Sequence, residues 1–178
     1  MYWWGPFVML LSFIVMEFMA WATHKFLMHG WMWYFHEDHH DVKPHFFERN
    51  DVFFLIYAIP SWLCIMLGMM NDNYVPVWLG YGIALYGFTY FMIHDVYIHR
   101  RFKWLRDIDH PYFMAIRKAH KVHHKHIGKE HGECFGMLVV PKKYYKEAKL
   151  IFERKNRQYE FIWMGYDFHH HRSFRFKF

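Results

Sequence analysis

The stretch VPVWLGYGIALYGFTYFMI, residues 75–93, runs directly into HDVYIH, residues 94–99. The first part is apolar, and its length suits a helix that crosses a bilayer, which takes about 20 mainly apolar residues. The second part has a histidine at each end. This order predicts a membrane helix that delivers histidines to the bilayer surface, and it recurs elsewhere in the chain.

Two further stretches predict membrane-spanning helices. Residues 2–23 are apolar apart from Glu17, and residues 52–70 form an apolar run after Asn50 and Asp51. Asn73 and Pro76 suit the first turn of the third helix. We therefore predict an all-α integral membrane protein with about three transmembrane helices and a cytoplasmic histidine-rich helical cap.

The composition agrees with a membrane protein once it is read by segment. The 178 residues are 24% aromatic and include 13 methionines and 17 histidines. The mean hydropathy is only -0.14, because the polar residues are concentrated between and after the apolar stretches. A soluble bundle of three buried helices is disfavoured, since too little chain remains to cover them.

The charge distribution predicts the orientation. The net charge is +6, yet Lys and Arg are absent from residues 1–23 and 70–79 and dense from residue 100 to 157. Cytoplasmic segments of membrane proteins carry an excess of Lys and Arg. The amino terminus is therefore predicted outside, with residues 25–49 and the chain after residue 93 inside. The basic residues are split by apolar spans, so we expect no nucleic-acid partner.

Histidines follow two patterns, each of which occurs twice. HxxxxH occurs at residues 24–29 and 94–99, and HxxHH occurs at residues 36–40 and 120–124. Imidazole binds metals in its neutral form and suits iron, zinc, copper and nickel. Ten histidines exceed the ligands of one ion, so we predict two metal ions held by His24, His29, His36, His39, His40, His94, His99, His120, His123 and His124.

The spacings set geometric conditions on such a site. On a helix, HxxHH puts residues i, i+3 and i+4 on one face, so that three imidazoles can converge. Residues five apart lie roughly 140° around an ideal α-helix. Both histidines of HxxxxH therefore reach one ion only if the helix ends, bends or bulges between them; otherwise they serve different ions.

Three carboxylates are candidates for orienting the imidazoles. Glu17 lies inside the first span, about two helical turns before His24, so both face the same side. A carboxylate at membrane depth points to a function: either a hydrogen bond to a ligand histidine, which we favour, or a structural pair elsewhere. Asp38 and Asp95 adjoin ligand candidates; either can orient an imidazole or be a solvated surface group.

The remaining histidines fall outside the two patterns. We expect each of them to lie on the surface or behind the metal ligands: His45, His110, His126 and His131. The run of residues 169–171 belongs to a basic, aromatic tail that lies on the membrane surface or is disordered, and it is predicted to be unrelated to the metal site.

The order HxxxxH, HxxHH, HxxxxH, HxxHH resembles the membrane fatty acid hydroxylase and sterol desaturase superfamily. Within it, ATHKFLMHGW (residues 22–31), YFMIHD (90–95) and AHKVHH (119–124) resemble the bacterial β-carotene hydroxylases. The similarity extends from the first span to about Pro141. One stretch, GECFG at residues 132–136, departs from the pattern expected there.

The resemblance implies a cofactor, a reaction and a location. It implies two iron ions, molecular oxygen as co-substrate and electrons from ferredoxin or another donor. The implied reaction hydroxylates β-carotene at carbon 3 of the β-ionone ring, giving β-cryptoxanthin and zeaxanthin, in the bacterial cytoplasmic membrane. Residues 1–150 would form the membrane di-iron hydroxylase domain and residues 151–178 the tail.

Two alternatives remain open at this point. One is a hydroxylase or desaturase of another lipid, such as a fatty acid or a sterol. The other is a non-catalytic membrane protein that binds zinc or copper for storage or relay. Product analysis distinguishes the first alternative, and metal content distinguishes the second.

Overall fold

A computed structural model gives the structure of residues 3–41, 46–128, 130 and 132–172. These residues contain helices and connecting segments but no strand. The elements in chain order are α1 (Gly5–Ala22), η1 (Thr23–Trp31), α2 (Trp33–His40), η2 (Arg49–Asp51), α3 (Val52–Met70), α4 (Tyr74–Phe91), η3 (Met92–Ile98), α5 (Pro111–His123) and α6 (Lys142–Arg172).

Three helices are long and apolar enough to cross a membrane: Gly5–Trp31, Arg49–Met70 and Tyr74–Ile98. This confirms the three predicted spans; the start at Tyr2 lies outside the described residues. The first and third helices extend past the predicted ends, because α1 and α4 continue directly into the π-helical segments η1 and η3, which carry the HxxxxH motifs.

Helix α4 packs between α1 and α3, and two of its glycines allow the close approach. A Cβ atom on Gly82 would lie 2.4 Å from the Met9 carbonyl oxygen of α1, and one on Gly80 would lie 2.7 Å from the Ser61 carbonyl oxygen of α3. Side-chain hydroxyls reinforce both contacts, since Ser12 Oγ donates to Leu79 O and Ser61 Oγ donates to Gly80 O. Small residues serve the same purpose in other membrane helix pairs.

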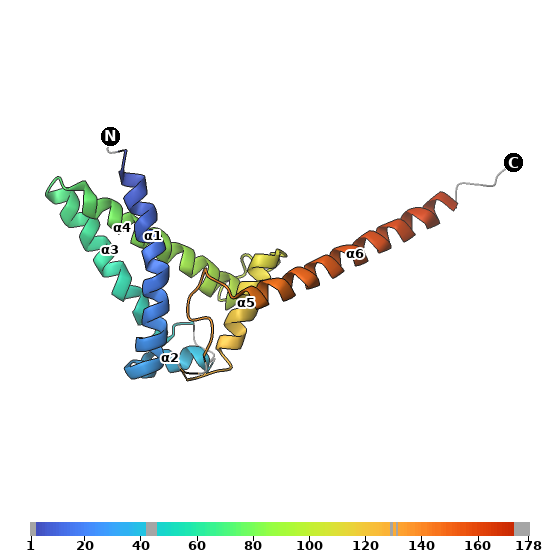
Figure 1. Ribbon diagram of the computed structural model, residues 1–178, viewed down its shortest axis with the longest axis horizontal. Coiled ribbons are helices and arrows are strands. Elements are labelled where there is room, and N and C mark those ends of the chain that lie inside the picture. Colours follow the sequence, from blue (N-terminus) through green and yellow to red (C-terminus); the bar gives the residue numbers. More distant parts are fainter. Residues whose placement is uncertain (1–2, 42–45, 129, 131, 173–178) are drawn as a thin grey trace.

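The histidine-bearing elements gather at one end of this bundle. The amino terminus and the α3–α4 connection lie together at the opposite end (Figure 1). Helix α5 packs on α6, where Tyr144 and Ala148 are buried against α5 residues. Helix α6 then projects away from the bundle and continues past residue 150 without a break. The division at residue 150 stays a prediction.

Candidate metal centre

The two HxxxxH motifs lie on π-helical segments, and this places both histidines of each pair on one side. In a π-helix the N–H of residue i+5 bonds to the carbonyl oxygen of residue i, and such turns are frequent at functional sites. His99 N donates to His94 O at 2.9 Å, and Met32 N donates to Leu27 O at 2.9 Å. The helix thus bulges between the paired histidines, which is one of the distortions that would let both of them reach one ion.

Nine of the ten predicted ligand histidines fall into two groups among the described residues. Within each group the candidate ligand atoms all lie within 4.8 Å of one another. The first group consists of His24, His29, His36, His40 and His123, and the second consists of His39, His99, His120 and His124. The groups adjoin, since the rings of His40 and His124 stack with centroids 4.5 Å apart.

Each HxxHH motif is divided between the two groups. His36 and His40 join the first group, whereas His39, between them in sequence, joins the second. The other motif is divided in the opposite sense: it gives its residues 120 and 124 to the second group and residue 123 to the first. Residues i+3 and i+4 differ by roughly 100° around a helix, so each motif contributes to both histidine groups instead of converging on one.

His94 belongs to neither group, yet it borders the second. Its buried ring stacks on His39 with centroids 4.7 Å apart and lies 4.5 Å from His99. The histidines outside the motifs lie elsewhere. His110 and His126 are exposed, residues 169–171 lie at the far end of α6 (Figure 1), and His45 and His131 lie outside the described residues.

Backbone carbonyls fix the orientation of three imidazoles in the first group. The Nδ1 atoms of His24, His29 and His123 donate to the carbonyl oxygens of Phe135, Ile127 and Glu133 at 2.9, 2.7 and 3.0 Å. A carbonyl oxygen only accepts, so Nδ1 carries the proton in each ring. Nε2 is therefore left with its lone pair facing the group.

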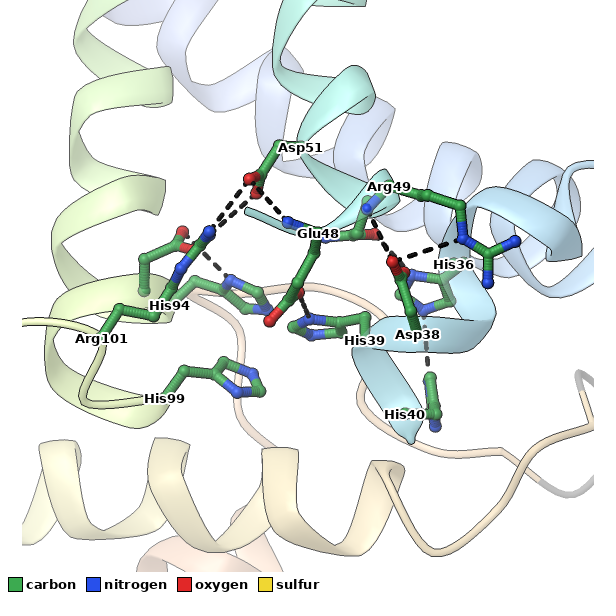
Figure 2. Close-up of polar contacts among 12 residues, drawn as sticks. His36, Asp38, His39, His40, Glu48, Arg49, Asp51, His94, His99 and Arg101 are labelled. Atoms are coloured by element: carbon green, nitrogen blue, oxygen red, sulfur yellow. Dashed lines mark hydrogen bonds and ion pairs between the residues drawn. The ribbon is translucent and has the colours of Figure 1, made fainter. Parts of the chain in front are cut away.

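Two side chains that the sequence analysis missed orient further imidazoles. Glu48 Oε2 accepts from His39 Nδ1 at 2.8 Å, and Asn50 Oδ1 accepts from His36 Nδ1 at 2.7 Å. Figure 2 shows Glu48 reaching from the η2 turn towards His39. A polar run directly before an apolar span was the available signal. A ligand histidine commonly donates its other ring N–H to such a partner.

The buried imidazoles outside the spans are held neutral. Burial lowers the pKa of His39 and His120 well below 6.5. Burial likewise lowers the pKa of His40 to about 4 and that of His123 to about 2, with neighbouring histidines adding to both shifts. At neutral pH these rings are therefore uncharged, which is the form that binds a metal.

The contacts inside each group fit a bound cation. His24 Nε2 lies 3.1 Å from His36 Nε2, and His99 Nε2 lies 2.8 Å from His120 Nε2. Where Nδ1 carries the proton, such a contact brings lone pairs together. His39 Nε2 is also buried without a hydrogen-bond partner. A metal ion would accept these lone pairs, so the donor set suits a metal that binds imidazole nitrogen.

Glu17 is placed differently from the prediction. Among the described residues it makes no hydrogen bond to a histidine. Its Oε1 instead accepts from the backbone N–H groups of residues 137, 138 and 139 at 3.0, 2.8 and 3.0 Å, and its Oε2 accepts from Tyr86 Oη at 2.7 Å. Glu17 therefore ties the first span to the segment whose carbonyls hold His24 and His123.

The two other predicted carboxylates have separate roles. Asp95 Oδ2 lies 3.3 Å from His94 Nδ1, so it contacts an imidazole, which is one of the two roles considered for it. Arg101 joins Asp95 to Asp51 at 2.7 and 2.8 Å and so links the third span to the second. Within the described part of the chain Asp38 makes no hydrogen bond to an imidazole; it accepts from Arg49 N at 2.7 Å.

The sequence matches the fatty acid hydroxylase family over residues 9–140. The chain belongs to this family. It is 36% identical to the β-carotene hydroxylase of Pantoea ananas over 78% of each chain, and 35% identical to that of Pseudescherichia vulneris over 84% of each chain. It is also 35% identical to the chloroplastic β-carotene 3-hydroxylase of Gentiana lutea, covering 71% of this chain and 40% of that one. No solved structure matches the chain.

Membership makes the chain a hydroxylating oxidoreductase. The matched region contains all four histidine motifs together with Glu17 and the segment that Glu17 holds. The non-catalytic alternative is therefore disfavoured.

Removing the carboxylate partner of His39 should weaken metal binding. We expect Glu48→Ala to lower metal affinity about 10- to 100-fold, the usual effect of losing a partner that orients a ligand. Metal retained by the purified protein during titration with a chelator measures this. Glu37→Ala is the matched control, because Glu37 is a nearby carboxylate that forms an ion pair with Arg49. Equal retention by both variants would show that Glu48 does not support the site.

Glu17 should matter through the segment it holds. Glu17→Ala leaves three backbone N–H groups without their acceptor, and we expect about a tenfold loss of hydroxylase activity. Glu17→Gln keeps one acceptor oxygen, so its loss should be smaller and well below that of His24→Ala. Tyr86→Phe removes only one of the four hydrogen bonds and is the control. Wild-type activity in Glu17→Ala would contradict this role.

Proposed function

We propose that this protein hydroxylates β-carotene at carbon 3 of the β-ionone ring, giving β-cryptoxanthin and then zeaxanthin. The relatives from Pantoea and Pseudescherichia are named β-carotene hydroxylases, and the relative from Gentiana is named a 3-hydroxylase. The observation that carries the proposal is the pair of adjoining imidazole groups at one end of three membrane-spanning helices. Such a site serves a lipid-soluble substrate.

The donor set supports two iron ions. The first group would hold one ion through His24, His29, His36, His40 and His123. The second group would hold the other through His39, His99, His120 and His124, with His94 beside it. When bound, iron with molecular oxygen supplies the oxidising power for an unactivated ring C–H bond, which no side-chain acid, base or nucleophile provides.

The protein's own groups prepare the site. The Nδ1 hydrogen bonds hold the rings in place before any ion binds, and such preorganisation keeps reacting groups in a productive geometry. Burial of His36, His120 and His123 excludes bulk water. One atom of molecular oxygen enters the C–H bond and the other leaves as water, so each turnover consumes two electrons and two protons. We propose that ferredoxin or another external donor supplies the electrons.

We propose that the protein lies in the bacterial cytoplasmic membrane with its amino terminus outside and the histidine groups on the cytoplasmic side. Support comes from the absence of Lys and Arg in residues 1–23 and 70–79, which include the end of the bundle opposite the histidines. A cysteine introduced at Asp72 should react with an impermeant thiol reagent in intact cells, whereas one introduced at Lys103 should react only after lysis. The reverse pattern would contradict the orientation.

Hydroxylation or desaturation of another lipid is the second candidate, because the matched family is named for fatty acids. The carotenoid substrate is favoured because the similarity to the β-carotene hydroxylases covers most of the chain.

The test is expression in bacteria that accumulate β-carotene, followed by chromatography and mass spectrometry of the extracted pigments. We expect mono- and dihydroxylated β-carotene with the wild-type protein. His24→Ala, His39→Ala and His123→Ala should each abolish the products, because each removes a ligand candidate. Membrane insertion should be retained, because none of the three changes makes a span less apolar.

The control is His110→Ala, which alters an exposed histidine outside both groups and should leave the products unchanged. Unaltered β-carotene with an iron-loaded, membrane-inserted wild-type protein and a working electron donor would contradict the carotenoid proposal. Analysis of the cellular fatty acids and sterols from the same cultures would then test the second candidate.

A further inference from the structure

An apolar groove lies between α1 and the segment of residues 134–141. Its volume is about 610 Å³, within the range of about 300–1,000 Å³ that small-molecule sites occupy. Phe13, Ile14, Phe18 and Trp21 of α1 form one wall, and Leu138 and Val139 belong to the other. The lining is apolar apart from a few polar groups, among them the carboxylate of Glu17.

The groove opens where the bilayer surrounds the protein. Its α1 wall belongs to the span Gly5–Trp31, and the side chains of Ile14, Phe18 and Val139 at the groove are exposed. Whatever enters from this side comes from the hydrocarbon of the membrane. An apolar molecule longer than the groove can therefore place one end inside it while the rest stays in lipid.

One side chain connects the groove to the first histidine group. Phe135 lines the groove, and its buried ring lies with its centroid 5.6 Å from His24 and 5.2 Å from both His29 and His123. Among the described residues, the histidine rings that Phe135 contacts belong to the first group. A molecule seated in the groove thus approaches the first group, with Phe135 between them.

The second wall is held in position by Glu17. Its carboxylate fixes the backbone N–H groups of residues 137–139 against α1. A Cβ atom on Gly136 would lie 2.8 Å from Glu17 Oε1, so a glycine allows the segment to come this close. The groove is preformed by these bonds, and preformed sites lose less entropy when a ligand binds.

We propose that this groove is the substrate site: it seats one β-ionone ring and the adjoining polyene, and presents the ring to the first histidine group past Phe135. The inference rests on the proposed function and adds to it the route of entry and the group that the ring faces. Because the groove is open on the lipid side, the far end of the substrate remains in the bilayer, and each ring is hydroxylated in a separate binding event.

Filling the groove tests the proposal. Ile14→Trp and Val139→Trp add bulk from opposite walls without touching a histidine group, and each should lower kcat/KM for β-carotene about tenfold or more. Leu10→Trp is the matched control. Leu10 and Ile14 both lie on α1, and their exposed fractions are 56% and 58%. Leu10, however, does not line the groove. The control should stay within about twofold of the wild type. Iron content should be unchanged in all three variants.

Binding gives an independent readout. Purified wild-type protein exposed to β-carotene should retain the pigment, seen by its visible absorption, and Ile14→Trp should retain less than Leu10→Trp. Wild-type kcat/KM and retention in both groove variants would overturn the assignment, as would a groove that retains phospholipid and excludes β-carotene. If the wild-type protein leaves β-carotene unmodified but hydroxylates another lipid, the proposed function is contradicted. If the groove variants then slow the reaction of that other lipid, the groove is still the substrate site. Only the assignment of a carotenoid as its occupant would be overturned.

Discussion

A hydrogen bond between residues five apart is the constraint on which the site depends. On a regular α-helix the two histidines of HxxxxH would point in different directions. The bond from His99 N to His94 O widens the turn, and the π-helical segment η1 does the same for His24 and His29. Both segments directly continue membrane-spanning helices. The spans therefore set the position of the candidate metal centre, and α2 and α5 complete it.

Burying so many imidazoles is unfavourable unless their polar atoms are satisfied. The structure satisfies one side of each oriented ring: Nδ1 donates to a carbonyl, a carboxylate or an amide oxygen. The other side faces further nitrogen atoms. Because a ligand that binds only the folded state stabilises that state, a metal ion bound by these groups would stabilise the folded form of this end of the protein. The packing of the spans, in contrast, depends on apolar helix contacts.

The segment after α5 joins three parts of the molecule. Its carbonyl groups orient His24 and His123, its backbone N–H groups bind Glu17, and its side chains form one wall of the groove. Four hydrogen bonds compensate the partial burial of the Glu17 carboxylate within the first span. The arrangement brings the apolar groove close to the first histidine group through Phe135, as the proposed oxidation of a lipid-soluble molecule requires.

The sequence by itself determined the three spans, because continuous apolar length is a local property. It also identified the ten histidines as ligand candidates and gave the expectation of two ions, because the repeated spacings and the number of histidines are visible in the chain. It also showed that both histidines of HxxxxH reach one ion only if the helix ends, bends or bulges between them. Only the tertiary structure decided how each HxxHH motif is divided, that Glu48 and Asn50 orient imidazoles, and that Glu17 binds residues 137–139 instead of a histidine. These contacts depend on how separate elements pack, and Glu17 is 121 residues from Leu138. No spacing along the chain encodes such a pairing.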